Sequence, residues 1–180
     1  MENNDDIIFT LNDKDINVDV KDIKEYSLRL SARGIVIRND GKIALQYKEK
    51  KNQYKLVGGG IENNEKPTIA FKREVLEEAG CEIDIVKKLG IIEEYRGFLN
   101  LKQISHVFVA NAINNINTLN LTEKEINEGA KIIWINPKDA LRMLKDSYDK
   151  LLPSEYDNLF DTQFDVVRDI KILEHYLKNI

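Results

Sequence analysis

The stretch GGIENNEKPTIAFKREVLEEAGC, residues 59–81, contains the pattern that decides the fold and indicates the chemistry. Its second half predicts a helix over residues 67–79. In such a helix Glu74, Glu77 and Glu78 stand at positions i, i+3 and i+4, so their carboxylates share one face. The sequence therefore predicts a helix that gathers three carboxylates at one place.

The residues at the two ends of this predicted helix support its bounds. Pro67 suits the first turn, where a backbone N–H is not needed, and Gly80 suits the residue after the last turn. Ile69, Leu76 and Ala79 fall on roughly the face opposite the carboxylates. We therefore expect these three side chains to pack into a core.

Three carboxylates on one patch repel one another unless a cation lies between them. At about 4 Å and an effective dielectric constant near 20, each pair would cost roughly 4 kcal/mol. A solvated acidic face, with the side chains spread apart, is the alternative. Mg²⁺ and Mn²⁺ prefer hard oxygen ligands of this kind, and Arg73 stands one turn before Glu77, where it can fix a carboxylate. A divalent-metal site is therefore one interpretation of the pattern.

The whole stretch resembles the Nudix box, G-x5-E-x7-R-E-U-x-E-E-x-G-U, in which U is an aliphatic residue. Every fixed position is matched up to the last one. There Cys81 replaces an aliphatic residue, and a buried cysteine behaves as a small hydrophobe. The chain thus resembles the Nudix hydrolases, with a box from Gly59 to Cys81. The matching residues are Gly59, Glu65, Arg73, Glu74, Glu77, Glu78 and Gly80.

The resemblance implies an enzyme that hydrolyses a phosphoanhydride bond in a nucleoside diphosphate linked to another group (NDP-X), by attack of water on an internal phosphorus. By position, the implied metal ligands are Glu74, Glu77 and Glu78, with the backbone carbonyl of Gly58. The implied ion is Mg²⁺, with Mn²⁺ as the alternative; it would neutralise phosphate oxygens and lower the pKa of the attacking water. Glu74 is also a candidate general base, although relatives differ in which carboxylate has this role.

The other residues of the box have supporting roles in this resemblance. Arg73 would orient the three carboxylates, and it is counted with them as catalytic. Glu65 and Gly80 would be structural. Gly59 and Gly60, whose backbone can approach a ligand closely, are candidates for binding the substrate.

A further metal ligand is sought outside the box. Some relatives use an additional glutamate from a loop before a late strand, and Glu123, Glu125 and Glu128 precede such a strand here. Glu128 is our choice, and a solvated acidic loop is the alternative.

Basic residues on the strands before the glycine loop are candidates for binding phosphate. Lys48 is our choice, against an ordinary surface lysine. Arg33 and Arg38 are weaker candidates, because strand alternation alone does not fix the face that each occupies.

The sequence says less about the substrate than about the reaction. Family members that cleave ADP-ribose often have a proline where this chain has Gly97. By elimination, a nucleoside triphosphate, normal or modified, is the favoured substrate. A base would find rings to stack on at Tyr47, Tyr54 or Phe108, although each of these is more often a core residue.

The rest of the chain predicts strands on both sides of the helix at residues 67–79. The turn Asn39-Asp40-Gly41 between two β-type runs is a strong hairpin signal. The expected fold is α+β, a Nudix-type α/β/α sandwich with a mixed central sheet and an additional C-terminal helix. Strands are expected at residues 15–20, 28–39, 42–48, 82–92, 104–111 and 131–135, and a short helix at 136–144.

The chain is expected to form a single domain over residues 1–180, with a Nudix core at about 29–145. Residues 1–28 form an N-terminal extension and residues 153–180 a helical C-terminal extension. The tail helix is expected to bury Phe164, Val167 and Leu173 and to be capped by Thr162 with Asp165.

Composition and charge exclude several other classes of protein. The 42% hydrophobic and 32% charged residues are typical of a globular domain. A net charge of −4 with scattered basic residues argues against binding to a nucleic-acid backbone. One cysteine excludes an intrachain disulfide, and no apolar run approaches transmembrane length. We expect a cytoplasmic protein with a small nucleotide-type substrate, no nucleic-acid or membrane partner, and a homodimer as the assembly that many relatives form.

Two alternatives to hydrolysis stay open. The first is a non-catalytic nucleotide-binding or regulatory module on the same fold; such modules typically lose box carboxylates, all of which are present here. The second is an isomerase on the same fold, which requires a reactive cysteine, and Cys81 lies past the end of the predicted helix.

Overall fold

The computed structural model describes residues 6–19, 25–115 and 118–180. Within these ranges an eight-stranded mixed sheet forms the centre of the molecule. The strands are β1 (Ile7–Asn12), β2 (Ser27–Ile37), β3 (Ile43–Lys48), β4 (Gln53–Leu56), β5 (Gly58–Gly60), β6 (Cys81–Arg96), β7 (Leu101–Asn115) and β8 (Ala130–Ile135). Their order is β1-β6-β7-β2-β3-β4, with β5 beside β2 and β8 beside β3. β1 is parallel to β6 and β2 to β7, and the other pairs are antiparallel.

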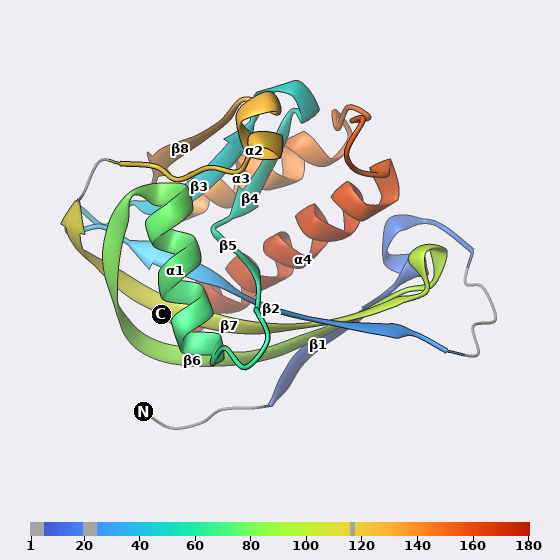
Figure 1. Ribbon diagram of the computed structural model, residues 1–180, viewed down its shortest axis with the longest axis horizontal. Helices are drawn as coiled ribbons and strands as arrows, with labels where there is room; N and C mark the ends of the chain where they lie inside the picture. The colour runs from blue at the N-terminus through green and yellow to red at the C-terminus, as the bar shows by residue number, and fades with distance from the viewer. Residues whose placement is uncertain (1–5, 20–24, 116–117) are drawn as a thin grey trace.

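Helices cover both faces of this sheet (Figure 1). The helices are α1 (Pro67–Ala79), α2 (Glu123–Asn127), α3 (Pro137–Tyr148) and α4 (Leu159–Lys178). α1 packs on one face, and α3 and α4 pack together on the other. The expected α/β/α sandwich with a mixed sheet and an added C-terminal helix is confirmed. No helix in the described part of the chain is both long and apolar enough to cross a membrane.

Alternation along β2 divides the core into two clusters. Val36 faces α1 and packs in one cluster with Phe71, whereas Ile35 faces α4 and packs in the other with Phe164. All four side chains are at most 1% exposed. β2 is therefore a central strand that is buried on both faces, and the polar residues on it need specific partners.

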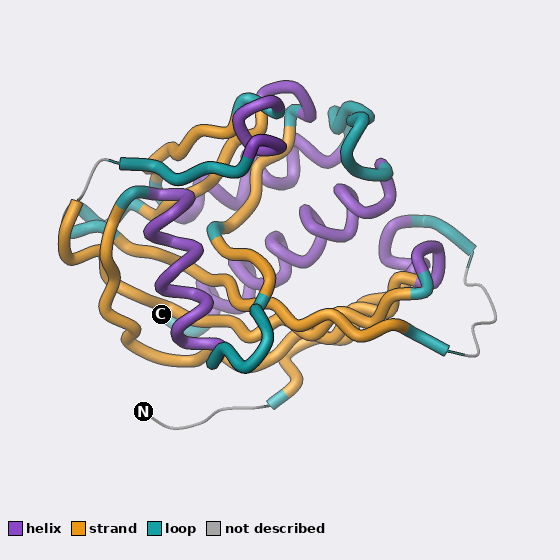
Figure 2. Tube along the Cα trace, in the orientation of Figure 1, coloured by secondary structure: helices purple, strands orange, loops and turns teal. Residues whose placement is uncertain are grey.

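The predicted hairpin is present. β2 and β3 pair antiparallel, with Ile37 opposite Ile43, and Gly41 adopts the positive φ of 79° that the turn requires. The predicted strands after α1 are also present, but β6 and β7 are longer than predicted. Together with β2 they extend past α1 and α4, and short helical turns lie at their far end (Figure 2).

Helix α1 has the predicted bounds, but a different face of it is buried. Phe71 is fully buried and stacks on Phe108, so this ring sets the inward face. Ile69 and Leu76, which we expected in the core, are 54% and 37% exposed, whereas Ala79 is buried as expected. The burial of Phe71 has a consequence for the chemistry, because it places the carboxylate of Glu78 on the buried side of the helix.

The strand expected at residues 15–20 is wrong within the described residues. The chain instead forms a 3₁₀ turn, η1 (Asp13–Ile16), preceded by the edge strand β1. Asn12 caps this turn: its side chain accepts from the Lys14 N–H, and its own N–H donates to Asp15 at 2.8 Å. This reciprocal cap offers the backbone local hydrogen bonds that compete with a strand. Residue 20 lies outside the described residues.

The C-terminal helix begins earlier than the proposed cap at Thr162 and Asp165. Asn158 is the N-cap, and its side chain accepts from the N–H of Phe160 at 2.9 Å. Thr162 is buried inside the first turns, and Asp165 is used in ion pairs instead. The expected burial is confirmed for Phe164 and Leu173, and the half-buried Val167 packs against the same cluster.

Candidate active site

Glu78 is the most deeply placed carboxylate of the box, with 3% of its side chain exposed. It accepts from the N–H of Gly58 at 2.8 Å and from Nζ of Lys55 at 3.0 Å. The same ammonium group also donates to the carbonyl of Gly58 at 3.3 Å. Burial raises the pKa of Glu78, and Lys55 and the Gly58 N–H lower it, with a net rise. The carboxylate is therefore held against the glycine strand β5 by a lysine.

Arg73 fixes the other box carboxylates. Its guanidinium donates to both oxygens of Glu65 at 3.0 Å and to the carbonyl of Gly60 at 3.0 Å. Nη1 also donates to Glu74 at 2.8 Å and to Glu77 at 3.4 Å. The hydrogen bonds from Arg73 lower the pKa of Glu65. Bidentate pairing of this kind gives a rigid geometry, so Arg73 joins the glycine strand, the loop before α1 and two carboxylates.

Each glycine of β5 has a different steric requirement. A Cβ on Gly59 would lie 2.4 Å from Oε2 of Glu74, so this carboxylate occupies the space beside the glycine. Gly58 has a φ of +132°, and a Cβ there would lie 2.4 Å from the carbonyl oxygen of Ala32. A Cβ on Gly60 would meet only Nη2 of Arg29, at 4.0 Å. Gly59 therefore makes room for a functional carboxylate, and Gly58 for the neighbouring strand.

Glu77 is the most accessible of the three α1 carboxylates, with 33% of its side chain exposed. Burial raises its pKa, as do the charges of Glu74 and Glu125, and Arg73 lowers it. The net rise reflects burial first, and then the like charges of neighbouring carboxylates. A divalent ion would relieve this repulsion.

The donor atoms at this site suit a hard divalent cation. Glu74, Glu77, Glu78 and the carbonyl of Gly58 offer oxygen ligands of the kind that Mg²⁺ and Mn²⁺ prefer. As the side chains stand, no three carboxylate, imidazole or thiol groups within the described residues are placed to hold an ion. Protein cations pair with these carboxylates instead: Lys55 with Glu78, and Arg73 with Glu74 and Glu77. Coordination of an ion by the same oxygen of Glu78 would require Lys55 to move away from it.

Glu125 is the loop glutamate that lies near the box. It is on the short helix α2, accepts from Nε2 of Gln46 at 3.3 Å, and its charge acts on both Glu77 and Glu78. Burial would raise its pKa, but the N–H of Thr122 and nearby Lys55 lower it to about 2. Glu125 is therefore an ionised carboxylate in the electrostatic surroundings of the box.

Glu128, the loop glutamate chosen from the sequence, has other partners. It is 1% exposed and accepts from Nζ of Lys48 at 2.7 Å, with Lys51 at 3.6 Å and the hydroxyl of Ser154 at 3.3 Å. Glu128 and Lys48, which we expected to have separate roles, are thus paired with each other. Metal ligation by Glu128 and phosphate binding by Lys48 stay predictions.

Gly80 and Cys81 lie at the end of α1. Gly80 has a φ of +63°, and its N–H donates to the carbonyl of Leu76 at 3.1 Å. This left-handed residue ends the helix and turns the chain into β6. Cys81 is 2% exposed, and burial raises the pKa of its thiol.

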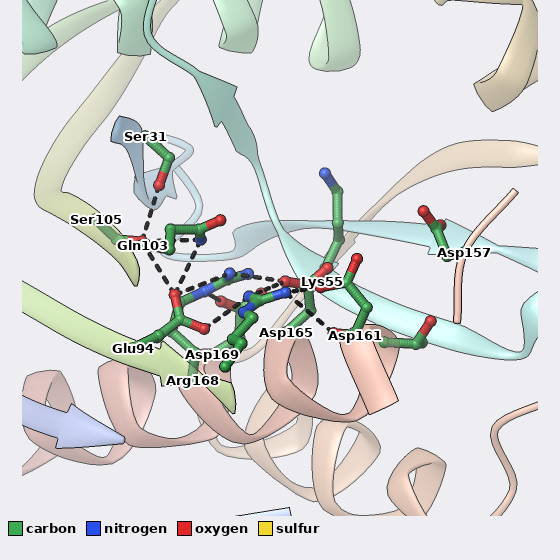
Figure 3. Close-up of polar contacts among 12 residues, drawn as sticks. Ser31, Lys55, Glu94, Gln103, Ser105, Asp157, Asp161, Asp165, Arg168 and Asp169 are labelled. Atoms are coloured by element: carbon green, nitrogen blue, oxygen red, sulfur yellow. Dashed lines mark hydrogen bonds and ion pairs between the residues drawn. The ribbon is translucent and has the colours of Figure 1, made fainter. Parts of the chain in front are cut away.

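Beneath the glycine strand lies a group of buried charges (Figure 3). Glu94 is fully buried and accepts from Arg96 at 2.7 Å and from Gln103 at 2.9 Å. Arg168 of α4 donates through Nε to Asp169 at 2.8 Å, and Asp169 accepts the N–H of Leu56 at 2.8 Å. These contacts tie α4 to the strand that leads into the site. Sequence reasoning missed them, because their members come from β4, β6, β7 and α4.

Asp165 joins the same group and makes stability depend on pH. Burial by itself would raise its pKa, but Arg168, Arg96 and Arg33 lower it well below its ordinary value. The unfolded carboxyl titrates near pH 3.9, so its stabilisation is present above about pH 4 and is lost as the pH falls further.

Asp165→Asn is therefore expected to flatten the decrease in unfolding free energy between about pH 5 and pH 3. Urea unfolding at a series of pH values measures this slope. Asp84→Asn, at an exposed aspartate on β6, is the control. Equal slopes for Asp165→Asn and the unsubstituted protein would contradict the assignment.

Comparison with known proteins shows which protein family this chain resembles. The NUDIX domain model matches residues 28–154. Diphosphoinositol polyphosphate phosphohydrolase 2 of Rattus norvegicus is 33% identical over 94 residues, 52% of this chain and 49% of that protein. A MutT-like protein of Streptomyces ambofaciens is 24% identical over 120 residues, 66% of this chain and 71% of that protein. The chain spans about half the length of the first of these curated relatives.

Solved structures share the fold. A NUDIX hydrolase from Nitrosomonas europaea superimposes with a TM-score of 0.61 at 14% identity, over 85% of this chain and 90% of that chain. The E. coli ORF135 protein superimposes with a TM-score of 0.55 at 20% identity, over 85% of this chain and 91% of that chain. At such identities these likenesses show the fold alone. The domain match, which covers more than half of the chain, shows the family: this chain belongs to the Nudix hydrolases.

Proposed function

We propose that this chain is a divalent-metal-dependent pyrophosphohydrolase that cleaves a phosphoanhydride bond of an NDP-X-type substrate by attack of water. The observation that supports this most directly is the meeting of α1 with β5. There Glu74 lies beside Gly59, and Glu78 accepts the N–H of Gly58. Glu77 completes the acidic face on the same helix. This arrangement brings oxygen ligands for a metal next to backbone that a phosphate can approach.

The proposed ligands are Glu74, Glu77, Glu78 and the Gly58 carbonyl, with Mg²⁺ as the ion and Mn²⁺ as the alternative. When bound, such an ion supplies positive charge for phosphate oxygens and lowers the pKa of water. The chain's own residues fix the geometry. Hydrogen bonds to Glu65 and to the carbonyl of Gly60 hold Arg73 in place. Arg73 in turn donates to Glu74 and Glu77.

Glu74 is the proposed general base. Its side chain is 15% exposed, and a hydrogen bond of 2.8 Å from Arg73 fixes its carboxylate. Glu78 is only 3% exposed and has both oxygens engaged. Glu74 therefore combines a fixed position with access to water, which a base must have to accept a proton.

A non-catalytic nucleotide-binding or regulatory module is the alternative. The presence of every box carboxylate favours the enzyme. The test is hydrolysis of about 20 nucleotide derivatives with Mg²⁺ and with Mn²⁺, identifying which phosphorus takes up ¹⁸O from water. Tight binding of a nucleotide without turnover of any derivative would favour the module.

An isomerase that uses a reactive cysteine is disfavoured. Cys81 packs in the cluster between α1 and the sheet, with 2% of its surface exposed. Burial raises the pKa of the thiol, and a protonated thiol is a poor nucleophile.

The substrate panel should extend beyond simple nucleotides. The name of the Rattus norvegicus relative refers to diphosphoinositol polyphosphates, and that of a structural neighbour with a TM-score of 0.52 to UDP-X. A nucleoside triphosphate is the substrate reached by elimination from the sequence. We further propose a small-molecule substrate, no nucleic-acid partner and a cytoplasmic setting, on the grounds of charge and composition.

Glu125→Gln and Glu128→Gln are expected to have different effects. Glu125→Gln should lower kcat/KM by about tenfold, because it removes a charge beside Glu77 and Glu78. Glu128→Gln should mainly lower the melting temperature, because Lys48 loses the partner of a buried ion pair. Initial rates and thermal melts of both variants measure these effects. A larger loss of activity for stably folded Glu128→Gln would instead support Glu128 as a metal ligand.

A further inference from the structure

A small polar pocket adjoins the glycine strand on the side of α4, and we call it the Arg33 pocket. Its volume is about 130 Å³. Seven basic and three acidic side chains line it, together with two glutamines, Gly58 and Gly59. No aromatic or aliphatic side chain is among the described residues that form its wall. The pocket therefore suits a charged group better than a nucleobase.

Arg33 is buried in this pocket without a full set of partners. Its side chain is 5% exposed, and its Nε has no hydrogen-bond partner among the described residues. Burial lowers its pKa to about 10 and the charge of Arg168 adds to this effect, whereas the charges of three nearby carboxylates, among them Asp165, partly oppose it. Lys48 and Lys51, in the same pocket, have carboxylate partners at 2.7 and 2.5 Å. A buried cation whose Nε has no acceptor, and which makes no ion pair at hydrogen-bond distance with a described residue, is unfavourable, so an anion in the pocket would stabilise Arg33.

Of the two arginines considered from the sequence, Arg33 lines this pocket and Arg38 does not. Arg33 and Arg29 are four residues apart on β2, so they share a face, and both line the pocket. Arg29 is exposed. Arg38 has a different environment, because its guanidinium lies 5.1 Å from the ring of Trp134 and pairs with Asp40.

The Arg33 pocket is a direct neighbour of the box. Arg33 is paired with Gly58 across β2 and β5. Lys55 lines the pocket and lies 3.0 Å from Glu78. A group in the pocket would therefore lie next to any group held by the box carboxylates.

The size and chemistry of the pocket limit what it can hold. Sites for whole drug-sized ligands have volumes of about 300–1,000 Å³, so about 130 Å³ accommodates only part of a molecule. The sequence-based candidates for stacking a base lie elsewhere: Tyr47 and Tyr54 stack on each other, and Phe108 is buried against α1. Arginine is well suited to phosphate, because its planar fork of donors matches the phosphate oxygens.

We propose that the Arg33 pocket binds a phosphoryl group that lies outside the scissile anhydride, with Arg33 and Arg29 as its ligands. The substrate class is then a polyphosphorylated molecule, and an NDP-sugar without further phosphate lacks the group that this pocket holds. This inference rests on the proposed function, because it concerns another part of the same substrate. The phosphoryl group has two sources, the third phosphate of a nucleotide or a phosphate ester on a cyclitol ring.

The first test is binding without turnover. Calorimetry in EDTA compares tripolyphosphate and inositol hexakisphosphate as probes. We expect at least tenfold weaker binding by Arg33→Met than by the unsubstituted protein, weaker binding by Arg29→Ala, and unchanged binding by the control Arg38→Met. Arg29 is exposed, so its variant tests the pocket even if Arg33→Met folds poorly. Equal affinities for the unsubstituted protein and Arg29→Ala, or equal binding of unphosphorylated inositol, would overturn the proposal.

The second test is specificity during turnover. The ratio of kcat/KM for a polyphosphorylated substrate to that for ADP-ribose should fall at least tenfold in Arg33→Met. This ratio is measured once with ATP and once with a diphosphoinositol polyphosphate as the polyphosphorylated substrate. The substrate whose ratio falls more in Arg33→Met identifies the source of the phosphoryl group. If the substrates turn over but the ratio of kcat/KM values is the same in Arg33→Met and the unsubstituted protein, this inference is overturned and the proposed function is not. If no substrate turns over while Arg33-dependent probe binding persists, the anion site stands and the proposed function fails.

Discussion

Replacement of Glu78 by Gln is expected to lower kcat/KM by at least about 1000-fold, roughly 4 kcal/mol of transition-state stabilisation. Glutamine has the same size and can still accept the hydrogen bond that Glu78 accepts from Gly58 at 2.8 Å. A neutral amide cannot, however, supply a negative ligand to a divalent ion, nor neutralise Lys55. The loss should therefore be catalytic, and initial rates with saturating Mg²⁺ measure it.

Two controls separate loss of chemistry from loss of folding. Glu82→Gln changes an exposed glutamate just past α1, which is hydrogen-bonded to Asn114, and its rate should stay within about twofold. Thermal melts should show Glu78→Gln folded at the assay temperature. A folded Glu78→Gln protein with more than a tenth of the original kcat/KM would exclude Glu78 from the proposed metal site.

Gly59→Ala is expected to reduce kcat/KM by at least about 100-fold with little change in stability. The new Cβ would lie 2.4–2.6 Å from the carboxylate atoms of Glu74, which must therefore move. Because this carboxylate is the far end of a flexible side chain, the fold can accept the change. The proposed general base would then be displaced from its position, and kcat and the melting temperature, measured together, test this.

Alanine substitutions at the two neighbouring glycines serve as controls for Gly59→Ala. Gly58→Ala should instead lower stability, since its Cβ would meet the backbone of Ala32 and its φ is +132°. For Gly60→Ala, with Arg29 at 4.0 Å as the nearest contact, the expected loss of activity is at least tenfold smaller than for Gly59→Ala. Full activity in Gly59→Ala would show that the position of Glu74 is not needed.

The sequence predicted the bounds of α1 and the short-range arrangement within the box, because these depend on local contacts. Glu65 and Arg73 are eight residues apart, and Gly80 ends the same helix. Such spacings determine the geometry once the helix forms. The buried face of α1 was less predictable: Ile69 and Leu76 are apolar, but the position of Phe71 against Phe108 decides the rotation of the helix. That choice depends on β7, which no local pattern in α1 specifies.

Contacts between distant segments were out of reach for a different reason. The N–H of Leu56 meets Asp169, which is 113 residues later in the chain. The face of Arg33 depends on the registers of β5 and β7 against β2. A one-residue change of register would turn Arg33 to the other face of the sheet. The residues of β2 alone do not determine either register.

The sequence contains a pattern from which the position of Glu125 could have been predicted. Thr122 and Glu125 have the spacing of a capping box, and the structure shows this box at the start of α2, with the Thr122 N–H donating to Glu125 at 2.9 Å. A capped helix start would have predicted a fixed position for Glu125. Glu128 comes just after the helix, where it turns toward Lys48 instead.

The measurement that tests the central claim most directly is anomalous diffraction from a crystal of this protein soaked in Mn²⁺. We expect one strong peak at direct coordination distance from Glu74, Glu77 and Glu78, with the Lys55 ammonium moved off the Glu78 carboxylate. A structure in which Lys55 still contacts Glu78 and no peak lies beside α1, at Mn²⁺ concentrations that support hydrolysis, would contradict the account.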